Sequence, residues 1–67
     1  MSIGYDKIII GVEQDGLKYV KSVTGGAFDL ATERTEAQVF SNTAGYDAIK
    51  TLQQENPDTV FLVLNGE

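Results

Sequence analysis

Acidic pairs are the residues of this chain whose types and spacing come closest to catalytic chemistry. Glu13 lies near Asp15, and Glu33 lies near Glu36. Two neighbouring carboxyl groups can hydrolyse a glycosidic bond, one as the acid and the other as the base or nucleophile. The first pair, however, flanks a predicted hairpin tip, where water solvates both groups, and the second stands at a predicted helix start, where the helix dipole stabilises acidic side chains. We therefore interpret both pairs as structural.

Other catalytic groups are missing from the chain. It contains no histidine and no cysteine, which excludes thiol chemistry, a His or Cys metal site and disulfide bonds. An activated amine would have to be a buried lysine, but every lysine falls on a polar or edge position: Lys7, Lys18, Lys21 and Lys50. The acidic turn at 13–16 carries too few ligands for a calcium loop. The sequence therefore predicts no catalytic residue, no metal and no cofactor, and we do not expect an enzyme.

Two adjacent glycines, Gly25 and Gly26, could belong to a phosphate-binding loop or to a tight turn. A phosphate loop places its glycines between a strand and the N-terminus of a helix. Here the short segment AFDLA, residues 27–31, comes before any helix, and GGAFD lacks the Lys and the Ser or Thr of the Walker pattern. Because glycine adopts a positive φ at no steric cost, the pair is predicted to form a two-residue hairpin turn. We expect no nucleotide to bind.

Length and charge limit the number of domains and the kinds of binding partner that this chain can have. The chain has 67 residues, ten of them acidic and five basic, with a net charge of −5. This length predicts a single domain over residues 1–67 with little spare stability. The acidic excess disfavours direct binding to nucleic acid and to anionic membranes. No apolar run approaches the roughly 20 residues that span a bilayer, and the start of the chain lacks the pattern of a signal peptide, so we expect a soluble cytoplasmic protein.

Turn residues and hydrophobic spacing predict the elements that position these side chains. Strands are predicted over residues 4–12, 17–23, 27–31 and 59–65, with hairpin turns at Asp15–Gly16 and at Gly25–Gly26. Thr35 and Gln38 fit a capping box that starts a short helix over 35–40. A second helix over 43–55 ends before Pro57. Its apolar stripe consists of Ala44, Ala48, Ile49 and Leu52.

This order of elements predicts an α+β fold of two layers. A four-stranded sheet carries both helices on one face, in the chain order β-β-β-α-α-β. The two most apolar strands, 5–12 and 59–65, are expected to be adjacent and central, which favours the spatial order 3-2-1-4 with the last strand parallel to the first. The alternative is the order 1-2-3-4 in a fully antiparallel sheet.

The segment KYVKSVTGGAFDLATERTEAQVFSNTAGYDAIKTL resembles a layout found in small phage and prophage accessory proteins of unknown function. In that layout a strand pair leads to an A-x-x-F segment, a helix and a last strand. The resemblance covers about half of the chain and supplies no functional residue. It implies a similar fold and a phage-encoded binder of a host protein. The matching residues are all core positions: Phe28, Leu30, Ala37, Phe40, Ala48 and Leu52.

Strands that are apolar on both faces are typical of sheets covered on both faces. The predicted helices cover only one face, so the other is expected to lie open, with Ile9, Phe61 and Val63 on it. Such a patch marks an interface. We therefore predict a small non-catalytic interaction or structural module that binds a protein partner and forms a homodimer through this face or through an edge strand. Tyr46, on the outer face of the second helix, is a further candidate interface residue.

An alternative function follows from the charge. An acidic protein can imitate nucleic acid and inhibit a DNA- or RNA-handling enzyme of the host. The carboxylates that could form such a row are Glu13, Asp15, Asp29, Glu33, Glu36 and Asp58. An acidic surface also simply keeps a small protein soluble. Loss of partner binding with added salt would distinguish the mimic from an apolar interface.

Overall fold

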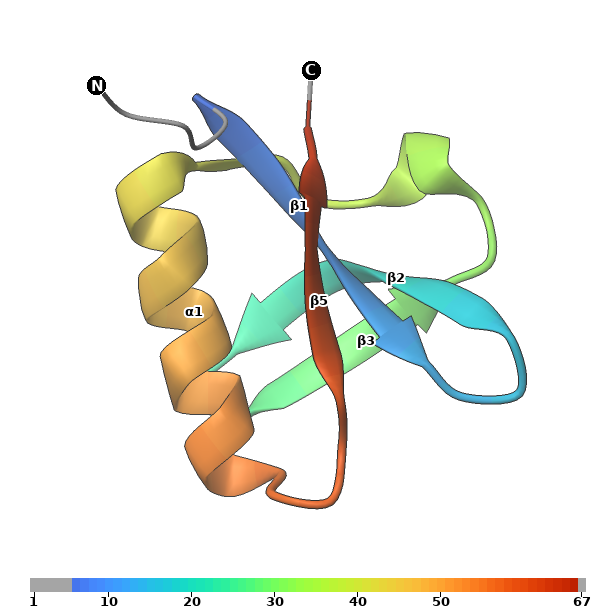
Figure 1. The fold of residues 1–67 in the computed structure, drawn as a ribbon, viewed down its shortest axis with the longest axis vertical. Helices are drawn as coiled ribbons and strands as arrows, with labels where there is room; N and C mark the ends of the chain where they lie inside the picture. The colour runs from blue at the N-terminus through green and yellow to red at the C-terminus, as the bar shows by residue number, and fades with distance from the viewer. Residues whose placement is uncertain (1–5, 67) are drawn as a thin grey trace.

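Apolar and β-branched residues form the strands of this chain, in an α+β fold that is described over residues 6–66 by a computed structural model (Figure 1). Residues 4 and 5 of the first predicted strand lie outside the described residues. All strand pairings are antiparallel. The elements in chain order are β1 (Lys7–Glu13), β2 (Leu17–Thr24), β3 (Ala27–Ala31), the 3-10 turn η1 (Arg34–Glu36), β4 (Phe40–Ser41), α1 (Asn42–Glu55) and β5 (Phe61–Asn65).

Both predicted hairpin turns are confirmed. Asp15 and Gly16 connect β1 to β2 with φ values of 53° and 101°, and Gly25 has φ 60° between β2 and β3. Glycine and aspartate tolerate this left-handed region better than other residues. The Gly25–Gly26 pair therefore joins two strands, which is the hairpin interpretation and not the arrangement of a phosphate loop.

The turn at Gly25–Gly26 also docks on the end of α1. A Cβ atom on Gly26 would lie 2.8 Å from the Cβ of Glu55, closer than side-chain atoms approach. The Asn56 side-chain amide donates to the Gly26 carbonyl over 3.1 Å. Gly26 is therefore needed for close approach, while Gly25 is needed for its positive φ.

Replacing either glycine with valine should lower the free energy of unfolding by on the order of 1 kcal/mol or more. At Gly25 the cause is backbone strain, and at Gly26 it is contact with the helix end. Urea denaturation followed by circular dichroism measures the change. Thr24→Val is the matched control, because it adds an exposed valine in the same hairpin without strain, and it should unfold like the wild type. A Gly25→Val or Gly26→Val variant as stable as this control would contradict the turn geometry.

β1 is the centre of the sheet, because it pairs along both of its edges. β5 lies along one edge, with Ile9 opposite Leu64. β2 and β4 share the other edge, β4 beside the start of β1 and β2 beside its end. The predicted adjacency of the first and last strands is thus confirmed, but the predicted parallel direction and the predicted central place of the last strand are wrong, because β5 is antiparallel to β1 and pairs with β1 alone among the described strands.

The direction differs because residues 35–40 do not form the predicted helix. Only Arg34–Glu36 form a 3-10 turn, and its N-cap side chain makes no capping hydrogen bond. The main-chain N–H of Gln38 donates to the Val20 carbonyl over 2.9 Å. Phe40, in β4, pairs with Ile8 of β1. Pairing with two strands thus outweighs a capping box in a segment too short to hold an isolated helix. β4 adds a reversal of the chain, so β5 returns antiparallel to β1.

The predicted second helix is confirmed as α1, with a shifted cap and a shifted apolar face. Ser41 caps it by accepting from the Ala44 amide over 3.3 Å. Ala44 is exposed, and the buried positions of α1 are Gly45 and Leu52, with Ala48 and Ile49 half-buried. Gly45 lets α1 approach β1, because a Cβ there would collide with the Ile8 side chain. Within residues 6–66, α1 is the one α-helix, so the prediction of two helices is wrong.

The sheet is curled, which replaces the predicted two layers. β2 pairs with β1 from Leu17 to Tyr19, and beyond that its pairing with β3 is irregular between Val20 and Ser22, as in a bulge that increases twist. β2 and β3 then cross β1 and β5 at a steep angle (Figure 1). Phe28 of β3 and Phe61 of β5 meet edge to face, with ring centroids 5.4 Å apart. The two outer strands therefore pack against each other through their side chains.

The core lies between this curled sheet and α1. Its buried cluster consists of Ile10, Val12, Val20 and Leu52. α1 and η1 lie on opposite sides of β1 and β5 (Figure 1), and the Arg34 side chain donates to the Asn65 main-chain oxygen. This bond ties the η1 segment to β5. Both faces of β1 are buried, with every residue from Ile8 to Val12 shielded from solvent.

Candidate interaction surface

The four predicted interface residues do not form one surface. Ile9 is only 2% exposed, and Phe61 and Val63 are half-buried. Tyr46 is 48% exposed on α1. The expectation that one sheet face lies open is therefore wrong for Ile9, which the monomer already buries.

The predicted facing of the last strand is also wrong. Phe61 lies opposite Val12. Val63 lies opposite Ile10. Directly opposed residues of an antiparallel pair share a face, so both side chains point to the side of the buried cluster. Ile9 points to the other side. Leu62 and Leu64 share that second side with Ile9 and Gly11.

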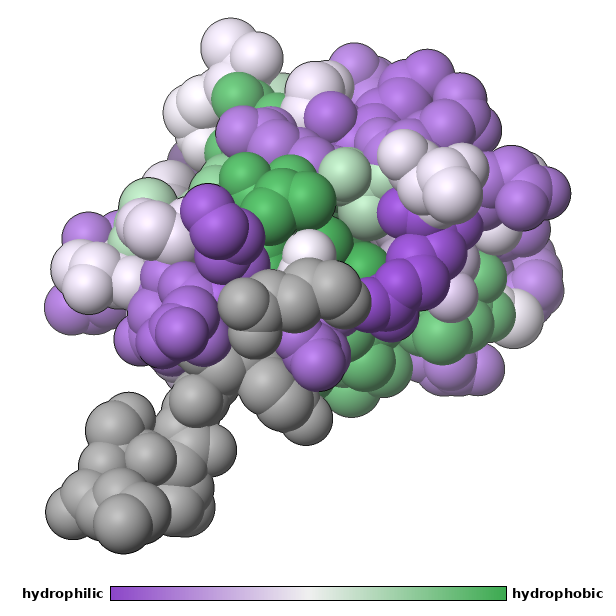
Figure 2. Space-filling model, turned by 90° about the horizontal axis from the view of Figure 1, so that it is seen from above, coloured by the Kyte–Doolittle hydropathy of each residue, from purple (hydrophilic) through white to green (hydrophobic). Residues whose placement is uncertain are grey.

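Exposed apolar side chains are spread over the molecule. Seen from above, the surface has an apolar area framed by hydrophilic side chains (Figure 2). The large exposed apolar residues come from different elements and loops: Leu17, Val39, Tyr46 and Val60. Single apolar residues at a surface are common and need no partner. Among residues 6–66, these four exposed residues by themselves therefore do not define an interface.

The main chain of β5 offers a strand edge. Its outward groups follow from the register, in which Asn65 lies opposite Ile8. The Gly66 amide donates to the Lys7 carbonyl over 2.9 Å, so Gly66 and every second residue before it bond to β1. Residues 61, 63 and 65 therefore direct their N–H and C=O groups away from β1. Within residues 6–66, β1 is the one strand that pairs with β5.

This outward edge is bounded at both ends. Before it, the Thr59 amide donates to the Asn56 carbonyl, and the Thr59 carbonyl accepts from the Gln53 side chain, each over 3.0 Å. After it, the Asn65 carbonyl accepts from Arg34. The outward groups of Phe61 and Val63 lie between these bonds and meet no acceptor or donor in the described part of the chain. The edge is thus a short stretch of unused hydrogen-bonding groups.

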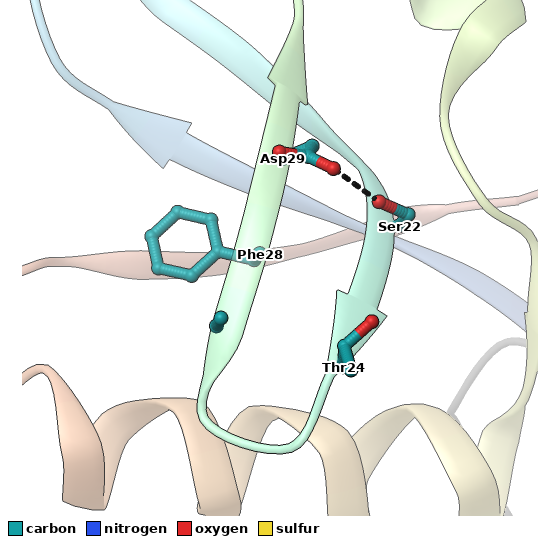
Figure 3. A pocket seen from close by; sticks show the side chains of 5 residues that line it. Ser22, Thr24, Phe28 and Asp29 are labelled. Atoms are coloured by element: carbon teal, nitrogen blue, oxygen red, sulfur yellow. Dashed lines mark hydrogen bonds between the residues drawn. The ribbon is translucent and has the colours of Figure 1, made fainter.

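A shallow hollow lies over the β2–β3 hairpin (Figure 3). Ser22, Thr24, Ala27, Phe28 and Asp29 line it, and its volume is about 70 Å³. The Ser22 hydroxyl donates to Asp29 Oδ2 over 2.8 Å. This pair was not predicted, although a two-residue turn at Gly25–Gly26 places Ser22 opposite Asp29 by counting outward. The hollow is much smaller than the roughly 300 Å³ of typical ligand pockets.

A second hollow, of about 250 Å³, brings together residues from the first hairpin and the loop before β5. Glu13 and Gln14 line one side, and Asp58, Thr59 and Val60 line the other. Glu13 and Asp58 belong to the acidic row predicted from sequence. Two of those carboxylates therefore share one place on the surface. Asp15 lies in the β1–β2 turn, while Glu33 and Glu36 lie at η1.

Geometry excludes some sites in the part of the chain that the structure describes. Between residues 6 and 66, no group of three or more His, Cys, Asp or Glu side chains is placed to hold a metal ion. Over the same range, none of the helices combines the length and apolar character required to cross a membrane. Comparison with protein-family models, curated proteins and solved structures finds no match for this chain. Over residues 6–66 the chain is a small α+β domain in which β5 pairs along one edge with β1.

Proposed function

We propose that this chain is a non-catalytic protein-interaction module that binds through the outer edge of β5 and associates with itself. The observation that supports the proposal is the outward main-chain groups of Phe61 and Val63, which no residue between 6 and 66 uses. Adding a strand to such an edge forms main-chain hydrogen bonds and buries apolar side chains, which is a common mode of protein recognition.

The side chains of β5 favour this edge over the other one. Proteins usually protect exposed edges with charged residues or proline. β5 reads FLVLN and carries neither. β3, the outer strand at the other side of the sheet, carries Asp29 in its middle. An incoming strand therefore meets no charge on β5, whereas on β3 it meets a carboxylate.

The wild-type chain should form a homodimer at high micromolar concentration. Size exclusion coupled to light scattering measures the mass directly, over a dilution series. A mass of two chains that falls towards one on dilution supports the proposal. A mass of one chain at every concentration contradicts self-association. The resemblance to phage accessory proteins extends the proposal to a host protein as a second partner at the same edge.

A second candidate function is the acidic mimic of nucleic acid. The hollow where Glu13 and Asp58 meet is the observation that favours it. Binding of this kind weakens steeply as salt rises. Pairing between apolar strands of two chains that each carry a net charge of −5 instead becomes tighter, because salt screens their mutual repulsion. The sign of the salt dependence thus separates the two candidates.

A further inference from the structure

We infer that two copies of this chain pair through β5 in antiparallel register, with Leu62 on the two-fold axis. The inference rests on the proposed self-association and specifies its geometry. Pairing of this kind joins two curled sheets into one continuous sheet. The same strand edge serves both copies, as a closed two-fold contact requires.

The unused main-chain groups determine the register. In a symmetric antiparallel pair that uses only Phe61 and Val63, Phe61 of one copy exchanges both of its main-chain hydrogen bonds with Val63 of the other. Leu62 then lies opposite Leu62 of the second copy. A register centred on Val63 would instead require the Asn65 carbonyl, which already accepts from Arg34. A register centred on Phe61 would likewise require the main-chain groups of Thr59, which already bond to Asn56 and Gln53.

The side chains fit this arrangement. Leu62 is half-buried in the monomer and lies opposite Gly11 in β1, so its outer part remains available at the axis. Opposed residues that do not exchange hydrogen bonds have Cα atoms about 4.5 Å apart, which brings the leucines of the two copies into contact. No charged residue lies on β5, so no like charges meet along the paired strands.

Val63→Pro tests the pairing through one hydrogen-bond donor. The Val63 amide points away from β1, so proline there removes a donor to the second copy and leaves the β1–β5 ladder intact; proline is accepted at such edge positions. The variant should keep the wild-type circular dichroism spectrum, and its mass should fall from two chains to one. Val63→Ala is the matched control, because it also shortens the side chain but keeps the amide, and it should stay dimeric.

Leu62→Cys tests the register without relying on proline. The chain has no cysteine of its own, so a single introduced thiol can form a disulfide only with the same residue of a second copy. Oxidation of Leu62→Cys should give a covalent dimer, since the expected Cα separation suits a disulfide. Val60→Cys is the matched control on an exposed residue. In the proposed register the two Val60 positions lie about 13 Å apart along the strands, too far to be bridged.

Each outcome has a defined meaning. A folded Val63→Pro variant that remains dimeric overturns the β5 pairing but leaves self-association standing. A covalent dimer from Val60→Cys and none from Leu62→Cys overturns the register. If Val63→Pro fails to fold, the two cysteine variants decide the question. A monomeric wild type overturns both the proposed self-association and this inference. A dimeric wild type with the wrong response to the variants overturns this inference alone.

Discussion

Leu52→Ala should lower the free energy of unfolding by about 2 to 5 kcal/mol. The Leu52 side chain is fully shielded, with 0% exposed, and lies in the buried cluster with Ile10, Val12 and Val20. Removing it leaves a cavity between α1 and the sheet that the surrounding side chains fill only in part. A domain of this size has a total stability of roughly 3 to 10 kcal/mol, so the loss is a large part of the whole.

Urea denaturation followed by circular dichroism measures this change. Thr51→Ala is the matched control, because it places the same residue at the neighbouring, exposed position of α1 and should leave stability nearly unchanged. In a chain this short, each kcal/mol shifts the melting temperature by about 4 to 8 °C. A Leu52→Ala variant that melts within a degree or two of wild type would show that α1 presents a different face to the sheet.

Ile9→Glu should leave most of the protein unfolded. Ile9 is 2% exposed in the isolated chain, on the face of β1 opposite the main cluster. A carboxylate there loses its hydration without gaining a partner, which costs on the order of 4 kcal/mol or more even when the group takes up a proton. That cost is comparable to the total stability expected of a small domain.

This outcome separates two accounts of Ile9. If Ile9 lay on an open dimer face, as the sequence pattern predicts, Ile9→Glu would give a folded monomer of lower stability. If Ile9 is buried within one chain, the far-ultraviolet circular dichroism spectrum should lose its native form. Val39→Glu, at a residue 50% exposed, introduces the same charge at the surface and should fold normally. A folded, monomeric Ile9→Glu variant would restore the predicted interface.

The edge of β5 could be predicted only in part. Its residues are visible in the sequence as an apolar run, FLVLN. Which of them direct their main-chain groups outward depends on the register against β1, and that register is a tertiary property. A slip of one residue would exchange the outward and inward sets. The Ser22–Asp29 pair, in contrast, follows from the turn at Gly25–Gly26 by counting, because a two-residue turn sets the register of its own hairpin.

Local chemistry determined those parts of the fold that depend on near neighbours in the chain. Asp15–Gly16 and Gly25–Gly26 specify hairpin turns because few other residues accept a positive φ. The spacing of apolar residues before Pro57 specifies α1. This too depends on near neighbours, since a helix forms its main-chain hydrogen bonds within itself. Composition alone excluded thiol chemistry and a His or Cys metal site, because the chain has no histidine and no cysteine.

Tertiary structure alone decided what happens where distant segments compete for the same hydrogen bonds. Residues 35–40 carry a capping box, yet the Gln38 amide bonds to Val20 and Phe40 pairs with Ile8, because sheet pairing satisfies more of that short segment than one helical turn could. The resulting β4 reverses β5. Ile9, on the other face of β1, is also buried within one chain. Sequence patterns could not show this, because burial on the second face depends on how distant segments pack, which is not encoded in the alternation of apolar residues.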